Sequence, residues 1–373
     1  MTITEIAAKF DSYIRNQITK LPPAVPIHIY SNARKWFLNN LFTDLPDEEI
    51  KLPSDLTRTF WGLKFQSPLF NAAGIFKDAY GYEVVRRQGA GAFLIGTVTP
   101  HLRNGNAKGA FRTPFLPMPN SKATLNWLGL PNKGFEEIAK RISIIDKKSN
   151  CPIGVSISSS PNESGDFALK NLLEGFEIFT RTKVDFIELN ESCPNVPHEH
   201  SENFVDGLDI TLIHRLEFLQ DKFLSKRNKN LPVIVKFSND TTPEQIPVLI
   251  KKLIELGFDG INLGNTSTQY EKYRNLITPA EQVNYDFFIN NFGGGLSGNP
   301  LKENSLQLAS IAAKAIKELN LQREFHVIRT GGIECKEDWL KSEIAAISLN
   351  QWFTGYFEMF SKVGHKVYFH LFK

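Results

Sequence analysis

Short apolar runs alternate with amphipathic stretches from about residue 57 onward, and this alternation limits the folds open to the chain. Eight of the runs read as buried strands: Pro68–Ala73, Ala92–Val98, Ile153–Ile157, Phe186–Asn190, Val233–Phe237, Gly260–Leu263, His326–Thr330 and Ala345–Trp352. Helical patterns lie between them, at Lys133–Ile142, Leu169–Thr180, Pro243–Leu256, Ser305–Leu319 and Glu337–Lys341. Eight β/α units predict an α/β fold, a (β/α)8 TIM barrel. A doubly wound sheet also alternates, but the glycine-rich dinucleotide loop expected after its first strand is missing.

The first 50 residues have a different pattern, in which apolar residues recur at helical spacing from Ile3 to Ile18. Pro22-Pro23 ends that pattern, and a second helix is predicted from about Ser31 to Phe42. We therefore divide the chain into an N-terminal amphipathic helical segment, residues 1–50, and a barrel domain, residues 51–373. The two helices could pack on the barrel, lie on a membrane, or line a tunnel for an apolar ligand.

Charge and cysteine content exclude several classes of protein. The net charge of +3 is too small to indicate a nucleic-acid partner. The three cysteines have no paired spacing, which argues against a disulfide framework and against a zinc or iron–sulfur site. No run reaches the length of a membrane span and no signal-peptide pattern begins the chain, so we expect a cytoplasmic protein or one bound peripherally to a membrane.

The segment after the fourth predicted strand carries unusual chemistry. Asn190, Cys193 and Asn195 follow that strand, and in a barrel the C-terminal ends of the strands form the active site. A thiol can take up a proton, and carboxamides both donate and accept hydrogen bonds. A small buried cysteine beside turn-capping asparagines is the alternative, and the hexapeptide alone does not separate the two.

Polar and glycine residues also follow the other predicted strands. They are Gly74 and Lys77 after the first strand, which itself ends in Ala73, then Thr97 in the second, Lys236 in the fifth, Asn265 and Thr266 after the sixth, Gly331 and Gly332 after the seventh, and Thr354 and Gly355 after the eighth. Lys236 follows three apolar residues, so it should be buried and needs a partner. An electron-rich cofactor ring or a carboxylate would serve, and so would an internal salt bridge. The last two glycine turns together favour a phosphorylated cofactor.

Nine motifs in order resemble dihydroorotate dehydrogenases, the flavin mononucleotide (FMN) enzymes of pyrimidine synthesis, from roughly Leu52 to Gly364. The motifs are NAAGIFKD (71–78), IGTVTP (95–100), LNWLGLPNKG (125–134), ELNESCPNVP (188–197), VIVKF (233–237), GNTS (264–267), GGLSGNPL (294–301), RTGGI (329–333) and FTGY (353–356). The resemblance implies an FMN-binding TIM barrel that oxidises dihydroorotate to orotate in UMP biosynthesis.

The resemblance also implies roles for particular residues. Cys193 would take up the proton as catalytic base, and the loop through His198 and His200 would cover the substrate. The substrate-binding residues would be Lys77, Asn126, Asn190, Asn195, Asn265 and Thr266. The cofactor-binding residues would be Ala73, Gly74, Thr97, Asn190, Lys236, Gly298, Gly331, Gly332, Thr354 and Gly355.

Features of two branches of that family are mixed here. Helices ahead of the barrel, a lysine soon after the first AAG, and IGTVTP resemble the quinone-dependent, membrane-associated branch, in which Arg112 would line the quinone site. Cys193 instead resembles the soluble branch, because the quinone branch uses serine. Glu191 stands where both branches usually have an apolar residue, and Phe353 where the quinone branch usually has tyrosine. We favour quinone as the acceptor because of the N-terminal helices.

Other activities remain open. A soluble enzyme using fumarate or another small acceptor is the main alternative, and a variant that passes electrons to an iron–sulfur partner subunit is another. A nicotinamide-dependent pyrimidine reductase would need a nicotinamide site, for which we find no motif. A barrel that only binds a phosphorylated ligand, without catalysis, is a further alternative. It predicts a colourless protein that cannot be loaded with FMN.

Overall fold

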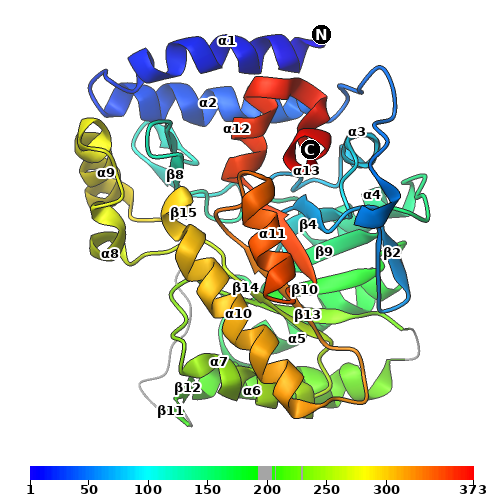
Figure 1. Ribbon diagram of the computed structural model, residues 1–373. Helices are drawn as coiled ribbons and strands as arrows, with labels where there is room; N and C mark the ends of the chain where they lie inside the picture. The colour runs from blue at the N-terminus through cyan, green and yellow to red at the C-terminus, as the bar shows by residue number, and fades with distance from the viewer. Residues whose placement is uncertain (192–203, 206, 228–229) are drawn as a thin grey trace.

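The computed structural model describes residues 1–191, 204–205, 207–227 and 230–373. Within these residues, eight parallel strands form the central sheet (Figure 1), in the order β3-β17-β16-β14-β13-β10-β9-β4. The two end strands approach each other, because Phe76 bridges Ile95 and the Gly74 N–H donates to the Gly96 carbonyl at 2.7 Å. The sheet is thus a nearly closed barrel, and the predicted TIM-barrel class is confirmed.

Five barrel strands coincide with the predicted ranges. They are β9 (Ile153–Ile157), β10 (Phe186–Asn190), β13 (Val233–Phe237), β14 (Gly260–Leu263) and β16 (His326–Thr330). The other three are shorter than predicted: β3 (Leu69–Asn71), β4 (Phe93–Val98) and β17 (Leu349–Trp352). The predicted start of β17 at Ala345 was wrong, because Ala345 and Ala346 end the preceding helix, with Ala346 at φ 59°.

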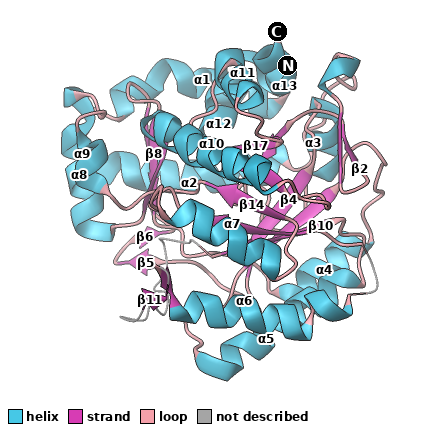
Figure 2. Ribbon diagram, turned by 60° about the horizontal axis from the view of Figure 1, so that its bottom comes forward, coloured by secondary structure: helices cyan, strands magenta, loops and turns pink. Residues whose placement is uncertain are grey.

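Helices cover the outside of the barrel (Figure 2). Helix α7 turns an apolar face inward, with Ile246, Leu249, Ile250 and Leu253 buried at helical spacing. The outer helices are α3 (Tyr82–Gln88), α4 (Phe135–Ser143), α5 (Gly165–Thr180), α6 (Ile210–Lys222), α7 (Gln245–Glu255), α10 (Lys302–Leu319), α11 (Lys336–Ile344), α12 (Thr354–Val363) and α13 (Val367–Phe372). Predicted helices therefore exist, with ends shifted by a few residues.

Several short elements decorate the barrel. The β1–β2 hairpin packs near the starts of two strands, since Trp61 Nε1 donates to the Asp259 carbonyl and the Trp61 ring contacts His326. The short strands are β1 (Arg58–Phe60), β2 (Leu63–Phe65), β5 (Ala107–Lys108), β6 (Phe111–Arg112), β11 (Phe204–Val205) and β12 (Leu208–Asp209). The 3-10 helices are η1 (Ser54–Leu56), η2 (Leu224–Lys226), η3 (Asn299–Leu301) and η4 (Gly364–Lys366).

The segment between residues 266 and 301, whose length and Asn and Gly content make it a plausible lid, contains regular secondary structure, and its role as a lid stays a prediction. It contains α8 (Tyr270–Arg274), α9 (Pro279–Phe292) and β15 (Gly295–Gly298). Strand β15 pairs with β8 (Ala123–Asn126), which pairs with β7 (Phe115–Met118). The large side chains of α9 bury themselves in a second apolar cluster with this small sheet. That burial fixes the segment beside the barrel mouth.

The N-terminal segment forms two helices, α1 (Ile3–Ile18) and α2 (Ala24–Leu41), which lie together beside α12 (Figure 1). Thr2 and Glu5 form a capping box that starts α1. Helix α2 begins before the predicted Ser31, because Pro23 and Pro26 fall at its start, where a missing N–H costs nothing. The division of the chain at residue 51 stays a proposal.

The apolar stripe of α1 faces outward. Ile3, Ile6, Phe10 and Tyr13 are each more than half exposed. The face turned toward the protein is instead partly polar, and Arg15 on that face forms ion pairs with Asp11 and with Glu358 of α12. None of the helices in the described ranges is long and apolar enough to cross a bilayer.

Candidate active site

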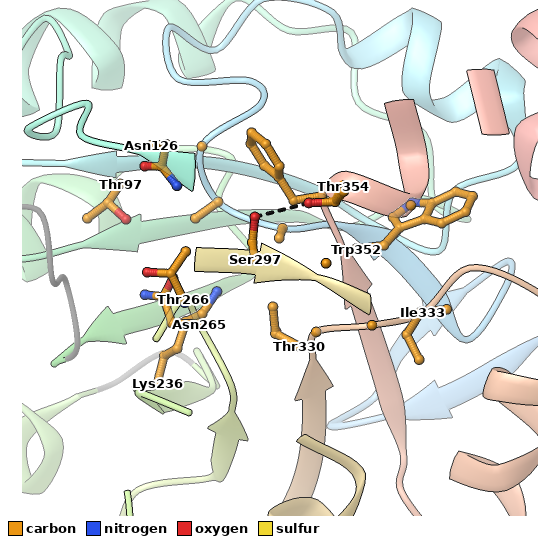
Figure 3. Close-up of a pocket in the computed structure, with 18 of the residues that line it drawn as sticks. Thr97, Asn126, Lys236, Asn265, Thr266, Ser297, Thr330, Ile333, Trp352 and Thr354 are labelled. Carbon is orange, nitrogen blue, oxygen red and sulfur yellow. Dashed lines mark hydrogen bonds between the residues drawn. The ribbon is translucent and has the colours of Figure 1, made fainter. Parts of the chain in front are cut away.

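A cavity opens at the C-terminal ends of the barrel strands (Figure 3). Apart from Arg112, every predicted site residue within the described ranges lines it: Ala73, Gly74, Lys77, Thr97, Asn126, Asn190, Lys236, Asn265, Thr266, Gly298, Gly331, Gly332, Thr354 and Gly355. Cys193, Asn195, His198 and His200 lie outside the described residues. The fold thus gathers residues that are up to about 280 positions apart in the sequence, because parallel strands place their C-terminal ends at one rim.

One wall of the cavity presents carboxamides and hydroxyls. Asn265 Nδ2 donates to Asn190 Oδ1 at 3.4 Å, and Asn190 Nδ2 donates to Thr97 Oγ1 at 2.9 Å. Asn126 Nδ2 donates to the Gly295 carbonyl at 3.3 Å. Thr266 Oγ1 is buried and has no hydrogen-bond partner among the described residues. A planar ligand with both donors and acceptors would satisfy this wall.

Two lysines supply positive charge. Lys77 follows β3 and is half-buried at the cavity edge, where it can meet an anionic group. Lys236 on β13 is 1% exposed, and its Nζ donates to Gln351 Oε1 at 3.0 Å and lies 3.6 Å from Glu188 Oε1. The internal salt bridge and the cavity position therefore coexist, and Lys236 belongs to both the barrel interior and the site.

The opposite end of the cavity suits a phosphate. Gly331 and Gly332 turn the chain with φ of 127° and 69°, which L side chains rarely adopt. Helix α12 begins at Thr354, so its first N–H groups lack partners within the helix and are available to bind an anion. Ser297 Oγ and Thr354 Oγ1 share a hydrogen bond at 3.0 Å on this side (Figure 3). Lys236 near one end and these groups at the other fit a flat ring that carries a phosphate.

Sequence reasoning missed several residues of the cavity wall. They are Ala72, Leu128, Leu130, Ser297, Thr330, Ile333, Glu334, Trp352 and Phe353. Ser297 and Thr330 lie inside the motifs GGLSGNPL and RTGGI, next to glycines that were selected, so position within a motif was the usable signal. Trp352 carried no such signal, because an aromatic residue at the end of a buried strand normally reads as core.

Glu191 is anchored at the point where the strand gives way to the predicted catalytic loop. Arg215 of α6 donates from Nε and Nη2 to both oxygens of the Glu191 carboxylate, at 2.7 to 3.0 Å. The Glu191 N–H also donates to the Lys236 carbonyl at 3.0 Å. A bidentate pair of this kind fixes the orientation of the Glu191 carboxylate as well as its position.

A second cavity lies between the N-terminal helices and the barrel. Its lining is mostly apolar and comprises Ala7, Ala8, Asp11, Arg15, Tyr30, Ala33, Arg34, Trp36, Phe37, Phe115, Pro117, Thr124, Thr354, Phe357 and Glu358. Thr354 borders both cavities. The barrel-mouth cavity and the helix-lined cavity are therefore separated by little more than the start of α12.

Arg34 is one of two arginines that line this second cavity, the other being Arg15, and the predicted role of Arg112 at the quinone site stays a prediction. Arg112 is exposed on β6 and does not line the cavity. Arg34 of α2 is buried, and its guanidinium carbon lies 5.7 Å from the centre of the Phe115 ring. Burial lowers the pKa of Arg34 to about 10. Its Nε has no hydrogen-bond partner in the parts of the chain that the structure describes, so a polar ligand group could bind there.

Comparison with known proteins points to one family. The family model described as dihydroorotate dehydrogenase matches residues 55–371. A protein from Trichodesmium erythraeum named dihydroorotate dehydrogenase (quinone) is 31% identical over 304 residues, 80% of this chain and 74% of that protein. A Marinomonas protein of the same name is 29% identical over 92% of this chain and 91% of its own length. The fold matches that of ligand-free DHODH from Eimeria tenella, with a TM-score of 0.72 and 22% identity over 92% of each chain.

Proposed function

The chain belongs to the dihydroorotate dehydrogenase family, and from this premise we propose that it uses FMN to oxidise dihydroorotate and passes the electrons to a quinone. Oxidation of dihydroorotate to orotate is a step of de novo pyrimidine (UMP) biosynthesis. The observation that carries the proposal is the single cavity in which the predicted substrate and cofactor residues meet. Steady-state assays with quinone, fumarate and NAD⁺ side by side, each with dihydroorotate, test it directly.

The residues around the barrel mouth have separate roles in the first half-reaction, the oxidation of dihydroorotate. Lys77 binds the substrate carboxylate, and Asn126, Asn190 and Asn265 bind the amide edges of the ring. Cys193 takes the proton from one ring carbon, while the hydrogen on the adjacent carbon leaves with its electron pair, so that a carbon–carbon double bond forms. FMN, when bound, supplies the acceptor for that hydride. Asn195 and the loop after it complete the substrate site.

The remaining cavity residues hold the cofactor. Ala73, Gly74 and Thr97 line the cavity, and Lys236 offers a buried positive charge to the ring. The Gly331–Gly332 turn and the N-terminus of α12, with Gly298 nearby, hold the phosphate. We expect the purified protein to be yellow and to contain one FMN per chain.

Replacing Lys236 with alanine is expected to weaken FMN binding about tenfold or more, because a charged hydrogen bond to the ring contributes about 1.5–3 kcal/mol. The measurement is the dissociation constant of FMN from fluorescence quenching. Lys147→Ala serves as the matched control, since Lys147 pairs with Asp185 on the side of the barrel where the strands begin. Unchanged FMN affinity and unchanged flavin reduction in Lys236→Ala would remove Lys236 from the site.

The helix-lined cavity supports quinone as the acceptor, because it is largely apolar and adjoins the proposed flavin site at Thr354. The outward-facing Ile3, Ile6, Phe10 and Tyr13 support peripheral contact with a bilayer, from which an apolar quinone could enter. Absence of sedimentation with lipid vesicles would count against that contact. A soluble enzyme using fumarate is the second candidate, favoured by Cys193 and Phe353. High turnover with fumarate and little with quinone would establish it.

Arg34→Ala is expected to raise the Michaelis constant for quinone about tenfold and to leave that for dihydroorotate nearly unchanged, because a charged hydrogen bond to the quinone oxygen is lost. The exposed Arg112 provides the matched control, and Arg112→Ala should change neither constant. Arg34→Lys should restore part of the quinone affinity by restoring the charge. If Arg112→Ala impaired quinone use and Arg34→Ala did not, the cavity would be misassigned.

A further inference from the structure

A carboxylate is buried inside the barrel beneath the proposed flavin site. Glu188 on β10 is fully buried and stands two residues before Asn190, so both side chains face the barrel interior. Its Oε2 accepts hydrogen bonds from Gln351 Nε2 and Asn262 Nδ2, both at 2.7 Å. Its Oε1 has no hydrogen-bond partner among the described residues and lies 3.6 Å from Lys236 Nζ. Two neutral amides thus orient the carboxylate toward one cation.

The same network reaches the cavity. Gln351 Oε1 accepts from Lys236 Nζ and from Thr330 Oγ1, each at 3.0 Å. Lys236 and Thr330 line the cavity, whereas Glu188 and Gln351 do not (Figure 3). The carboxylate therefore lies one layer deeper than the residues that would touch a cofactor, and it is linked to them through Lys236, Gln351 and Asn262, the last of which accepts from Thr330 Oγ1 at 2.9 Å.

Packing does not explain a charge at this position. Barrel interiors are normally filled by branched apolar side chains, and burying a carboxylate costs free energy even when a cation is near. The negative charge of Glu188 also lies beside Lys236, the residue whose positive charge faces the proposed flavin. Both groups are buried, so the effective dielectric constant between them is low and the carboxylate acts strongly on the lysine ammonium 3.6 Å away.

We propose that Glu188 is a positioning residue that acts through Lys236 and sets the redox potential of the flavin, an inference that rests on the proposed FMN function. Reduced FMN carries negative charge that Lys236 stabilises. Glu188 offsets part of the lysine charge and draws its ammonium toward the barrel interior. It therefore weakens binding of the reduced cofactor relative to the oxidised one, which keeps the flavin reducing enough to pass its electrons onward.

The test removes the charge and keeps the shape. In Glu188→Gln, reduced FMN should bind about tenfold more tightly relative to oxidised FMN, which for a two-electron couple raises the potential by about 30 mV. Spectroscopic titration of the holoprotein against reference dyes measures the potential. Glu281→Gln is the matched control, because Glu281 is also a buried glutamate, held by Asn120 and Ser121 outside the cavity. The flavin potential of Glu281→Gln should equal that of the unmodified protein.

A second background separates action through Lys236 from any other effect. Lys236→Met should lower the potential, and adding Glu188→Gln to it should then cause a much smaller rise than Glu188→Gln causes alone. The double variant also has no unpaired buried charge, so it can be measured if the single variant does not fold. An unchanged potential in Glu188→Gln, or an equal rise in both backgrounds, would overturn the inference. A protein that binds no FMN at all would instead refute the proposed function, and the inference with it.

Discussion

Replacing Cys193 with alanine is expected to slow flavin reduction by dihydroorotate by roughly 10²–10⁴-fold, the usual contribution of a general base. Binding of orotate should persist, because the substrate contacts of Lys77 and the asparagines remain. Stopped-flow absorbance of the flavin measures the reduction rate, and a spectral titration measures orotate binding. Reduction at near the unmodified rate in Cys193→Ala would refute the assignment of the base.

The pH dependence offers an independent check on the same residue. A base acts in its deprotonated form, so the reduction rate should fall as the pH drops below the pKa of the Cys193 thiol. In Cys193→Ser that fall should move to higher pH, because an alcohol ionises less readily than a thiol. Cys335→Ser is the control: burial, with hydrogen bonding to Glu337, raises the pKa of the Cys335 thiol to about 11, so this thiol stays protonated near neutral pH.

Lys77→Ala is expected to weaken binding of dihydroorotate and orotate by roughly 30-fold or more, because removing one partner of a desolvated charge pair costs about 2–5 kcal/mol. The dissociation constant of orotate and the Michaelis constant for dihydroorotate measure the effect. Lys133→Ala is the matched control, since Lys133 lines the cleft on the outer side of Lys77 but not the barrel-mouth cavity.

The outcome for quinone distinguishes a substrate role for Lys77 from a general loss of structure. In Lys77→Ala the Michaelis constant for quinone should stay within about twofold of the unmodified value, and Lys77→Arg should recover part of the orotate affinity because it restores the charge. Equal losses of orotate affinity in the Lys77 and Lys133 variants would show that the general positive charge of the cleft lined by both lysines, rather than Lys77 itself, attracts the substrate.

The structure changes how the acceptor is best tested. Deleting the first 51 residues would remove α2, whose Ile27, Leu38 and Leu41 are buried against the rest of the protein. Such a truncation would expose apolar core, and losses of buried leucines alone cost about 2–5 kcal/mol each. Point variants in the helix-lined cavity, such as those of Arg34, therefore test quinone use more cleanly than truncation does.

The sequence by itself determined the barrel and most of the barrel-mouth site. Strands buried on both faces leave uninterrupted apolar runs, so β9, β10, β13, β14 and β16 were predicted residue for residue. Residues just after such runs must share one rim, because parallel strands end on the same side. The positions of the cavity residues thus followed from local pattern together with a general rule of the fold, whereas their proposed catalytic roles rest on the family resemblance. The exact ends of the helices could not be predicted from local pattern, since capping and proline tolerance shift them by several residues.

Only the tertiary structure decided which distant side chains meet. It brought Arg34 to the second cavity, paired Lys236 with Glu188, and packed residues 266–301 around a second apolar cluster. It also turned the apolar stripe of α1 outward, although periodicity alone reads the same for a packed helix as for an exposed one. These outcomes depend on contacts between elements far apart in the chain, whose free energies no local pattern of residues encodes.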